Sequence, residues 1–153
     1  MTRILDKKMD RDTGGLHPLP RVSAVVVNWN GGHHLRKCVE ALLGTEGLDV
    51  EILVVDNCSS DGSLERLNDL VDRFRMIDAG GNLGFGAGVN RGAGSSDAPY
   101  VLALNPDVVL ERGAVAEMVG FLESHPTVGL VGPRLVDVSG KTQASCGTAP
   151  SLA

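Results

Sequence analysis

The stretch that decides the fold is residues 22–32, with the sequence VSAVVVNWNGG. Its first six residues are mostly β-branched and apolar, which is typical of a strand buried inside a parallel sheet. Polar residues and two glycines follow directly, and apolar residues then recur at the spacing of an amphipathic helix that Gly44 or Gly47 can end. These apolar residues are Leu35, Cys38, Val39, Leu42 and Leu43. We therefore expect a strand, a polar loop and a helix in this order.

The same alternation continues along the chain. Short apolar runs predict further strands at residues 50–55, 75–77, 100–104 and 128–131. Two more helices are expected from apolar residues at helical spacing, the first of them after residues 59–61, whose side-chain oxygens can cap it. The apolar faces are Leu64, Leu67, Val71 and Phe74 in the first helix, and Val115, Met118, Val119 and Leu122 in the second. This order predicts an α/β domain with a mostly parallel sheet.

Two segments depart from this regular pattern. Residues 80–94 are rich in glycine, which weakens a helix, so we expect these glycines to allow close approach to a ligand or another element. Residues 1–20 mix both charges with glycine and proline, which predicts a flexible tail. The α/β domain is therefore expected over residues 21–153.

Composition argues against several classes of protein. The net charge of −5, the aromatic share of 3% and the lack of a basic cluster argue against binding to nucleic acid. The three cysteines form no C-x-x-C pair, so neither a zinc site nor a disulfide framework is indicated. No apolar run is long enough to span a bilayer, and no signal peptide is visible. These features predict a chain located in the cytoplasm, either free or at the inner face of the plasma membrane.

Polar clusters follow three of the predicted strands, at residues 28–30, 56–62 and 105–107. Each cluster alone is explained by turns and helix caps. Together they indicate a ligand site, because ligands of open α/β sheets bind beyond the carboxyl ends of the strands. The known phosphate loops do not fit: residues 28–32 lack the G-x-G-x-x-G pattern, and a P-loop ending at residues 140–142 would need glycine in place of Leu135.

Four motifs in order resemble the family 2 glycosyltransferases, which have a Rossmann-like GT-A fold. They are VSAVVVNWN at residues 22–30, VVDN with SDGS at residues 54–63, GNLGFGAGVNRG at residues 81–92, and LNPDVV at residues 104–109. The Asn-Pro-Asp version is similar to the rhamnosyltransferase-like branch, which builds bacterial cell-wall and surface polysaccharides, and VGLVGPRL at residues 128–135 also fits that branch. The resemblance covers roughly residues 21–145.

The resemblance implies a role for each matching residue. Asp56 matches the family's aspartate that hydrogen-bonds the nucleobase, and Asp107 matches the last acid of the D-x-D motif that binds Mg²⁺ or Mn²⁺. Two positions depart from the common pattern, since Asn57 stands where many members have aspartate and Asn105 opens the D-x-D motif. The nucleotide-sugar-binding residues implied are Val27, Asn28, Asn30, Asp56, Asn57, Asn82, Gly84, Asn90 and Asn105.

The reaction implied is the transfer of a sugar from a nucleoside diphosphate to a hydroxyl group, with inversion at the anomeric carbon. The branch suggests dTDP-rhamnose as donor and a glycan or lipid-linked acceptor. In the family the base is an acidic residue well downstream of the Asn-Pro-Asp motif. Asp137 is interpreted as a turn residue, so we assign no catalytic residue. We expect the chain to be a C-terminally truncated nucleotide-binding portion that is inactive alone.

Alternatives remain for the function and for single residues. The chain can be a non-catalytic module that holds a nucleotide sugar. A nucleotidyltransferase is disfavoured, because it needs a basic glycine-rich loop after the first strand and residues 28–32 contain neither lysine nor arginine. His33 and His34 are adjacent on a helix, about 100° apart, so solvent-facing positions suit them better than one shared metal ion. Cys58 has no neighbour that would activate its thiol.

Overall fold

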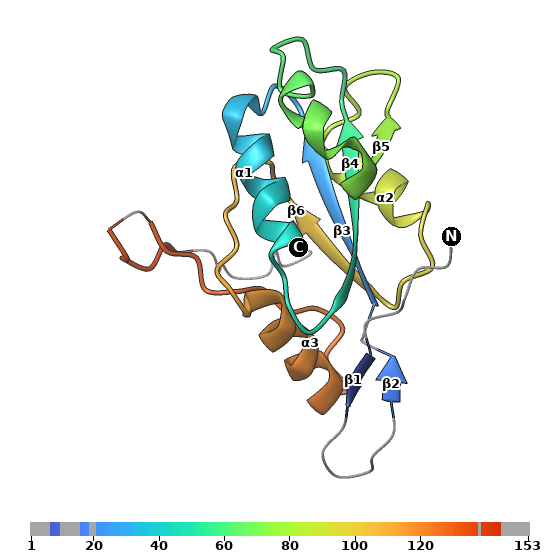
Figure 1. Cartoon of the computed structure of the whole chain (residues 1–153). Coiled ribbons are helices and arrows are strands. Elements are labelled where there is room, and N and C mark those ends of the chain that lie inside the picture. Colours follow the sequence, from blue (N-terminus) through green and yellow to red (C-terminus); the bar gives the residue numbers. More distant parts are fainter. Residues whose placement is uncertain (1–6, 10–15, 19–20, 138, 145–153) are drawn as a thin grey trace, which may run out of the picture.

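A computed structural model of the chain describes residues 7–9, 16–18, 21–137 and 139–144. Four parallel strands form the central sheet: β3 (Arg21–Asn28), β4 (Asp49–Asp56), β5 (Arg75–Asp78) and β6 (Tyr100–Leu104) (Figure 1). Their order in the sheet is β5-β4-β3-β6. The register places Asn28 beside Asp56 and Asp56 beside Asp78, so these strands end at one edge. The strand predictions in this part of the chain are confirmed.

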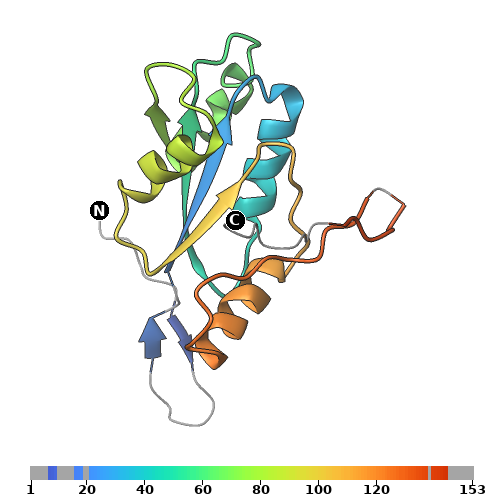
Figure 2. The same ribbon diagram turned by 180° about the vertical axis from the view of Figure 1, so that it is seen from behind.

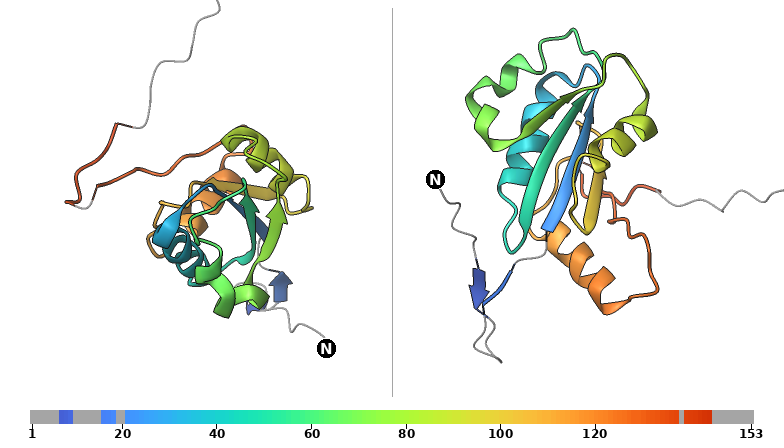
Figure 3. Two further views of the ribbon diagram at one scale, coloured as in Figure 1. Left: turned by 90° about the horizontal axis from the view of Figure 1, so that it is seen from above. Right: turned by 90° about the vertical axis from the view of Figure 1, so that its right-hand side faces the viewer.

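Helices cover both faces of the sheet (Figures 1 and 2). The first face carries α1 (Gly32–Leu43) and the 3₁₀ helix η1 (Glu65–Arg73), which pack on Ala24, Val26 and Val54. The opposite face carries α2 (Phe85–Ala93). Its glycines lie against Val25, Val27 and Val55, whose side chains point to this face of the sheet. α3 (Ala114–Ser124) packs near the start of β3. Figure 3 shows the sheet between its two helical layers.

Glycines bring α2 unusually close to the sheet. A Cβ atom on Gly88 would lie 2.7 Å from Cγ1 of Val27, and one on Gly92 would overlap Cγ1 of Val25. Both glycines are buried. The prediction that the glycine-rich segment serves close approach is therefore confirmed for these two positions, where the neighbouring element is β3.

Three expectations about the elements need correction. The helix after residues 59–61 is a 3₁₀ helix whose N-cap is Leu64, and Val71 is 56% exposed rather than part of its buried face. Residues 128–131 form no strand, and Leu130 is 88% exposed, because no described strand lies beside them to pair with.

The N-terminal tail also holds some order. β1 (Lys7–Met9) and β2 (Leu16–Pro18) pair as a short antiparallel ladder where a flexible tail was expected. The domain boundary at residue 20 stays a prediction. No helix in the described part of the chain is long and apolar enough to cross a membrane.

Candidate functional site

The three polar strand ends meet where the strand order reverses. From β3 the chain proceeds outward to β4 and β5, and then returns across the sheet to β6 on the other side of β3. Such a reversal opens a crevice at the carboxyl ends of the strands, which is the usual ligand position in open α/β sheets. The loops after β3 and β6 touch there, since a Cβ on Gly31 would lie 3.0 Å from Cβ of Pro106. The predicted gathering of the three clusters is consistent with this geometry.

Asn28 is the centre of the loop framework. Its side chain is completely buried, and its Nδ2 lies 2.9 Å from Asp56 Oδ1, Ser59 Oγ and Ser63 Oγ. An amide nitrogen has two hydrogens, so these three acceptors share them. Asn28 Oδ1 accepts the backbone N–H of Gly31 at 3.3 Å. The side chain of Asn28 therefore shapes the loops around the crevice and has little capacity left for a ligand.

Asp56 also belongs to this framework. It is 7% exposed, and its Oδ2 accepts the backbone N–H of Ser59 at 3.0 Å while Oδ1 faces Asn28. Its backbone carbonyl accepts the N–H of Ala79 at 3.0 Å. Each carboxylate oxygen keeps a further lone pair, so Asp56 can still accept from a ligand while it holds the loop.

Residues 59–61 were predicted to cap the second helix. They connect the loops after β3 and β4 instead. Asp61 Oδ2 accepts the N–H of Gly32 at 2.7 Å, at the first residue of α1, and its Oδ1 accepts the N–H of Ser63. Hydrogen bonds from the Ser63 hydroxyl and from backbone N–H groups lower the pKa of Asp61. Asn30, in the left-handed region with φ of 53°, accepts the N–H of Ser60 at 2.9 Å.

Asn57 links this framework to the glycine-rich segment. Its side chain is 2% exposed, and its Nδ2 donates to the carbonyl oxygen of Gly84 at 3.3 Å. Its Oδ1 is buried and has no hydrogen-bond partner among the described residues. Leaving a buried acceptor unpaired costs about 1–3 kcal/mol. Asn82 Oδ1 accepts the N–H of Gly84, whose φ of 78° suits glycine.

The Asn-Pro-Asp turn supplies exposed oxygen atoms. Asn105 and Asp107 are both exposed directly after β6. Burial, and then the negative charge of Asp107, raises the pKa of the Cys38 thiol to about 12, which leaves that thiol unreactive. No group of three His, Cys, Asp or Glu side chains suited to a metal ion exists among the described residues. One carboxylate and one amide carbonyl fit a hard cation that takes its remaining ligands from a diphosphate and water.

The remaining residues named from the sequence lie in different surroundings. Val27 is buried against Gly88, so only its backbone can face a ligand, whereas Asn90 is exposed on α2. His33 and His34 are exposed as expected, although their ring centroids lie only 4.0 Å apart. Asp137 accepts from Ser139 and Lys141 and is a turn residue, as interpreted. Cys146 lies outside the described residues.

One prominent side chain of the first polar cluster, Trp29, was assigned no role from the sequence. Trp29 follows the buried Asn28 and is 59% exposed. The chain has an aromatic share of 3% and a single tryptophan. The rarity of aromatic residues in this sequence was the signal that could have drawn attention to Trp29. Ser59 was predicted to cap a helix and Ser63 was assigned no role, although both hydroxyls lie against Asn28.

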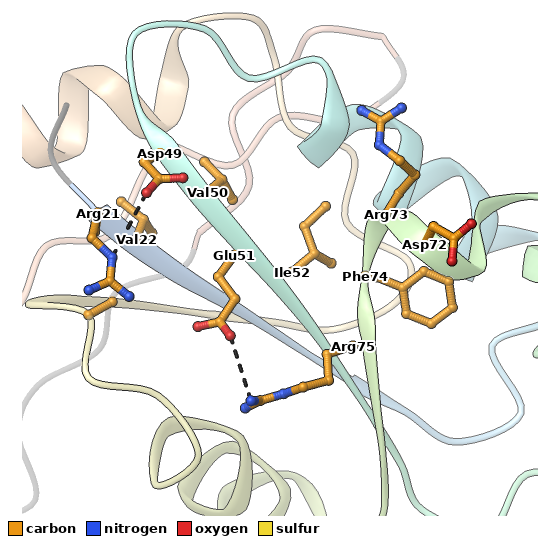
Figure 4. A pocket seen from close by; sticks show the side chains of 11 residues that line it. Arg21, Val22, Asp49, Val50, Glu51, Ile52, Asp72, Arg73, Phe74 and Arg75 are labelled. Carbon is orange, nitrogen blue, oxygen red and sulfur yellow. Dashed lines mark ion pairs between the residues drawn. The ribbon is translucent and has the colours of Figure 1, made fainter. Parts of the chain in front are cut away.

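A separate cavity of about 270 Å³ lies at the opposite edge of the sheet, around the first residues of β3, β4 and β5 (Figure 4). Its charged side chains largely pair with one another. Arg21 Nε lies 3.9 Å from Asp49 Oδ2, and Arg75 Nη1 lies 3.8 Å from Glu51 Oε1. None of the predicted site residues lines this cavity.

The comparisons with known proteins identify relatives of the chain in sequence and in fold. The chain is 30% identical over 139 residues to the N-acetylglucosaminyl-diphospho-decaprenol L-rhamnosyltransferase of Mycobacterium tuberculosis, a match that covers 84% of this chain and 45% of that protein. It is 29% identical over 102 residues to the succinoglycan biosynthesis protein ExoO of Rhizobium meliloti, covering 66% of this chain and 29% of that protein. The chain thus spans less than half the length of either relative.

Solved structures show the same fold. The mannosyltransferase PcManGT from Pyrobaculum calidifontis, in complex with GDP-Man and Mn²⁺, superposes with a TM-score of 0.65 at 21% identity, covering 72% of this chain and 34% of that one. S. aureus TarS 1–349 in complex with UDP-GlcNAc gives a TM-score of 0.62 at 19% identity, covering 69% and 32%. The fold is therefore that of the GT-A glycosyltransferases.

The sequence model described as "Glycosyl transferase family 2" matches residues 23–145. This match includes β3 from residue 23 onward, the strands β4 to β6 and all three polar strand ends. The chain therefore belongs to glycosyl transferase family 2.

Proposed function

We propose that the carboxyl edge of the sheet binds the nucleoside diphosphate of a sugar donor for an inverting glycosyltransferase. The observation that carries this proposal is the meeting of three polar strand ends at the reversal of strand order, in a chain of this family. The loops are tied to one another by buried hydrogen bonds around Asn28 and Asp56, which pre-organises the edge for a ligand.

We assign different residues at this edge to the nucleobase of the donor and to its sugar and phosphate groups. Asp56 and Asn57 lie at the end of β4 and are assigned to the nucleobase, next to the exposed ring of Trp29 after β3. Asn30, Asn82, Gly84 and Asn90 are exposed in the loop after β3, before α2 and on α2, and we assign them to the nucleotide sugar. A planar indole face favours stacking on a base.

A divalent ion, Mg²⁺ or Mn²⁺, is assigned to Asp107, with the carbonyl oxygen of Asn105 as a secondary ligand. When bound, such an ion neutralises charge on the departing diphosphate. Asp107 lies exposed beside the Asn28–Gly31 loop through the contact of Gly31 with Pro106, so an anion in the crevice can reach both.

Rhamnose, carried by dTDP, is proposed as the transferred sugar, and a lipid-linked saccharide as acceptor. The support is the 30% identity to a relative named as an N-acetylglucosaminyl-diphospho-decaprenol L-rhamnosyltransferase. Donor binding is assigned to the described residues. No described residue is assigned as catalytic base, because Asp137 is held within its own turn.

Calorimetry with dTDP and UDP, each with and without Mg²⁺ or Mn²⁺, tests this proposal. We expect weak binding of both nucleotides that the metal ion strengthens. AMP and inorganic phosphate serve as controls for unspecific anion binding. Equal heats for all these anions, with no effect of metal, would contradict the proposed function.

A further inference from the structure

One glycine allows the contact between the loop after β3 and the Asn-Pro-Asp turn. Gly31 has a φ of −74°, which any residue can adopt, so its backbone conformation does not require glycine. The space around it does, because a Cβ atom would lie 2.5 Å from Oδ1 of Asn28, and 3.0 Å and 3.1 Å from Cβ and Cγ of Pro106. The absence of a side chain on Gly31 therefore sets how closely the two loops approach each other.

Of these two neighbours, the side chain of Asn28 is the one that is held in place. It is completely buried, and its Nδ2 lies 2.9 Å from side-chain oxygens of Asp56, Ser59 and Ser63. Moving it would break buried hydrogen bonds, which is costly. Pro106, by contrast, is half-buried in a turn whose other two residues are exposed. A side chain in place of the glycine would therefore displace the turn and leave the loop after β3 where it is.

Both ends of the turn are anchored. The carbonyl oxygen of Asn105 accepts the N–H of Val108 at 3.3 Å and lies 3.9 Å from Sγ of the buried Cys38 on α1. Val108 itself packs against the core of the sheet. Pro106 and Asp107 lie between these two anchors. A displacement of Pro106 therefore moves the carboxylate of Asp107 more than it moves either end of the turn.

We propose that Gly31 is a positioning residue, which seats the Asn-Pro-Asp turn against the loop after β3 and thereby sets the distance between a metal ion on Asp107 and the bound nucleotide. This inference rests on the proposed function of the same edge. Gly31 acts through Pro106. The metal ion and the nucleotide strengthen each other's binding only while the turn is seated, because the ion must contact the diphosphate and Asp107 together.

The test measures the affinity for UDP with and without Mn²⁺, by calorimetry, for the unsubstituted chain and for Gly31→Ala. In the unsubstituted chain Mn²⁺ should strengthen UDP binding by about fivefold or more. In Gly31→Ala, UDP binding without Mn²⁺ should change by no more than about twofold, whereas the enhancement by Mn²⁺ should fall to about twofold or less. Gly81→Ala is the matched control and should keep the full enhancement, since a Cβ there would meet no atom within 4 Å and its φ is not positive.

Pro106→Gly gives a second reading, which decides the question should Gly31→Ala fail to fold. It removes both contact atoms from the other side, so the enhancement by Mn²⁺ should fall, and Gly31→Ala in this background should change it little further. A purely structural role of Gly31 predicts that Gly31→Ala weakens UDP binding equally with and without Mn²⁺. That outcome, or full enhancement in either single variant, overturns the inference. An unsubstituted chain that binds no UDP, or gains nothing from Mn²⁺, overturns the proposed function itself.

Discussion

Asp56 stabilises the loops through hydrogen bonds and is also proposed to bind the nucleobase, so its substitution should change stability as well as binding. Its carboxylate accepts from Asn28 Nδ2 and from the N–H of Ser59, and both groups would lose this buried acceptor in Asp56→Ala. We expect the free energy of unfolding to fall by about 1–3 kcal/mol, because the N–H of Ser59 loses its acceptor, while Asn28 Nδ2 keeps the hydroxyl oxygens of Ser59 and Ser63. Urea denaturation measures this change. Asp72→Ala, at an exposed position, is the control and should stay within about 0.5 kcal/mol. A stable Asp56→Ala variant would contradict the framework described for this loop.

Asp107 should act on the metal ion alone. Its side chain is exposed after β6, so Asp107→Asn is expected to leave the melting temperature unchanged. In the unsubstituted chain, Mn²⁺ should strengthen UDP binding by about fivefold or more, a common size for coupling between two ligands. In Asp107→Asn this enhancement should disappear. Calorimetry of UDP with and without Mn²⁺ measures the difference, with Asp72→Asn as control. Full enhancement in the variant would rule out Asp107 as a metal ligand.

At the residue scale, the sequence predicts which side chains gather but not how they are used. The polar clusters that contain Asn28, Asp56 and Asp107 follow from the strand ends, whereas the roles of Asp56 and Asp107 are implied by the family resemblance. The sequence does not reveal that Asn28 is fully bonded within the loops, since this depends on the positions of Ser59 and Ser63 across the chain. Local capping rules fail at residues 59–61 for the same reason: their best partners lie on another element.

The position of α2 depends on two missing side chains. A Cβ on Gly92 would overlap Val25 and approach Cγ2 of Val55 to 3.1 Å, so Gly92→Ala should push α2 away from the sheet. We expect a loss of about 1–3 kcal/mol in stability from overpacking. Nucleotide binding should weaken as well, because Gly84 at the start of α2 holds Asn57.

Two further variants separate overpacking from a general effect of alanine. Val25→Ala in the Gly92→Ala background should restore part of the stability by removing the overlapping methyl groups. Gly120→Ala on α3, where a Cβ would meet no atom within 4 Å, should stabilise by up to about 1 kcal/mol. Thermal melting of the set measures these differences. Equal effects of Gly92→Ala and Gly120→Ala would show that the close packing of α2 is unimportant.

At the element scale, long periodic patterns predict well and short apolar runs do not. The run at residues 22–27 could only be a buried strand, and the structure extends it by one residue at each end. The run at residues 128–131 looks equally strand-like in sequence, yet it has no neighbouring strand in the described part of the chain. Pairing is a property of the sheet, which a local pattern does not contain.

The whole chain should bind a donor without transferring its sugar. Binding of the donor stabilises the departing diphosphate. Transfer also requires that the acceptor hydroxyl be positioned and deprotonated. Positioning can lower a barrier by about 7–11 kcal/mol, and a general base typically contributes about 10²–10⁴-fold. No residue of the described part is assigned to either task. Incubation with dTDP-rhamnose, Mn²⁺ and a lipid-linked acceptor should therefore give at most slow donor hydrolysis. The M. tuberculosis relative serves as positive control, and comparable transfer by this chain would make Asp137 the first candidate base.

The central claim is the location of the nucleotide at the carboxyl edge, and nuclear magnetic resonance tests it most directly. UDP and Mg²⁺ are titrated into the ¹⁵N-labelled chain while the shifts of backbone amides are followed. We predict the largest shifts at Asn30, Ser59 and Gly84, whose N–H groups lie in the loops around the crevice. Arg21, Glu51 and Arg75, which line the cavity at the opposite edge, should stay unchanged (Figure 4). Shifts concentrated at that cavity, with none in the strand-end loops, would contradict the account.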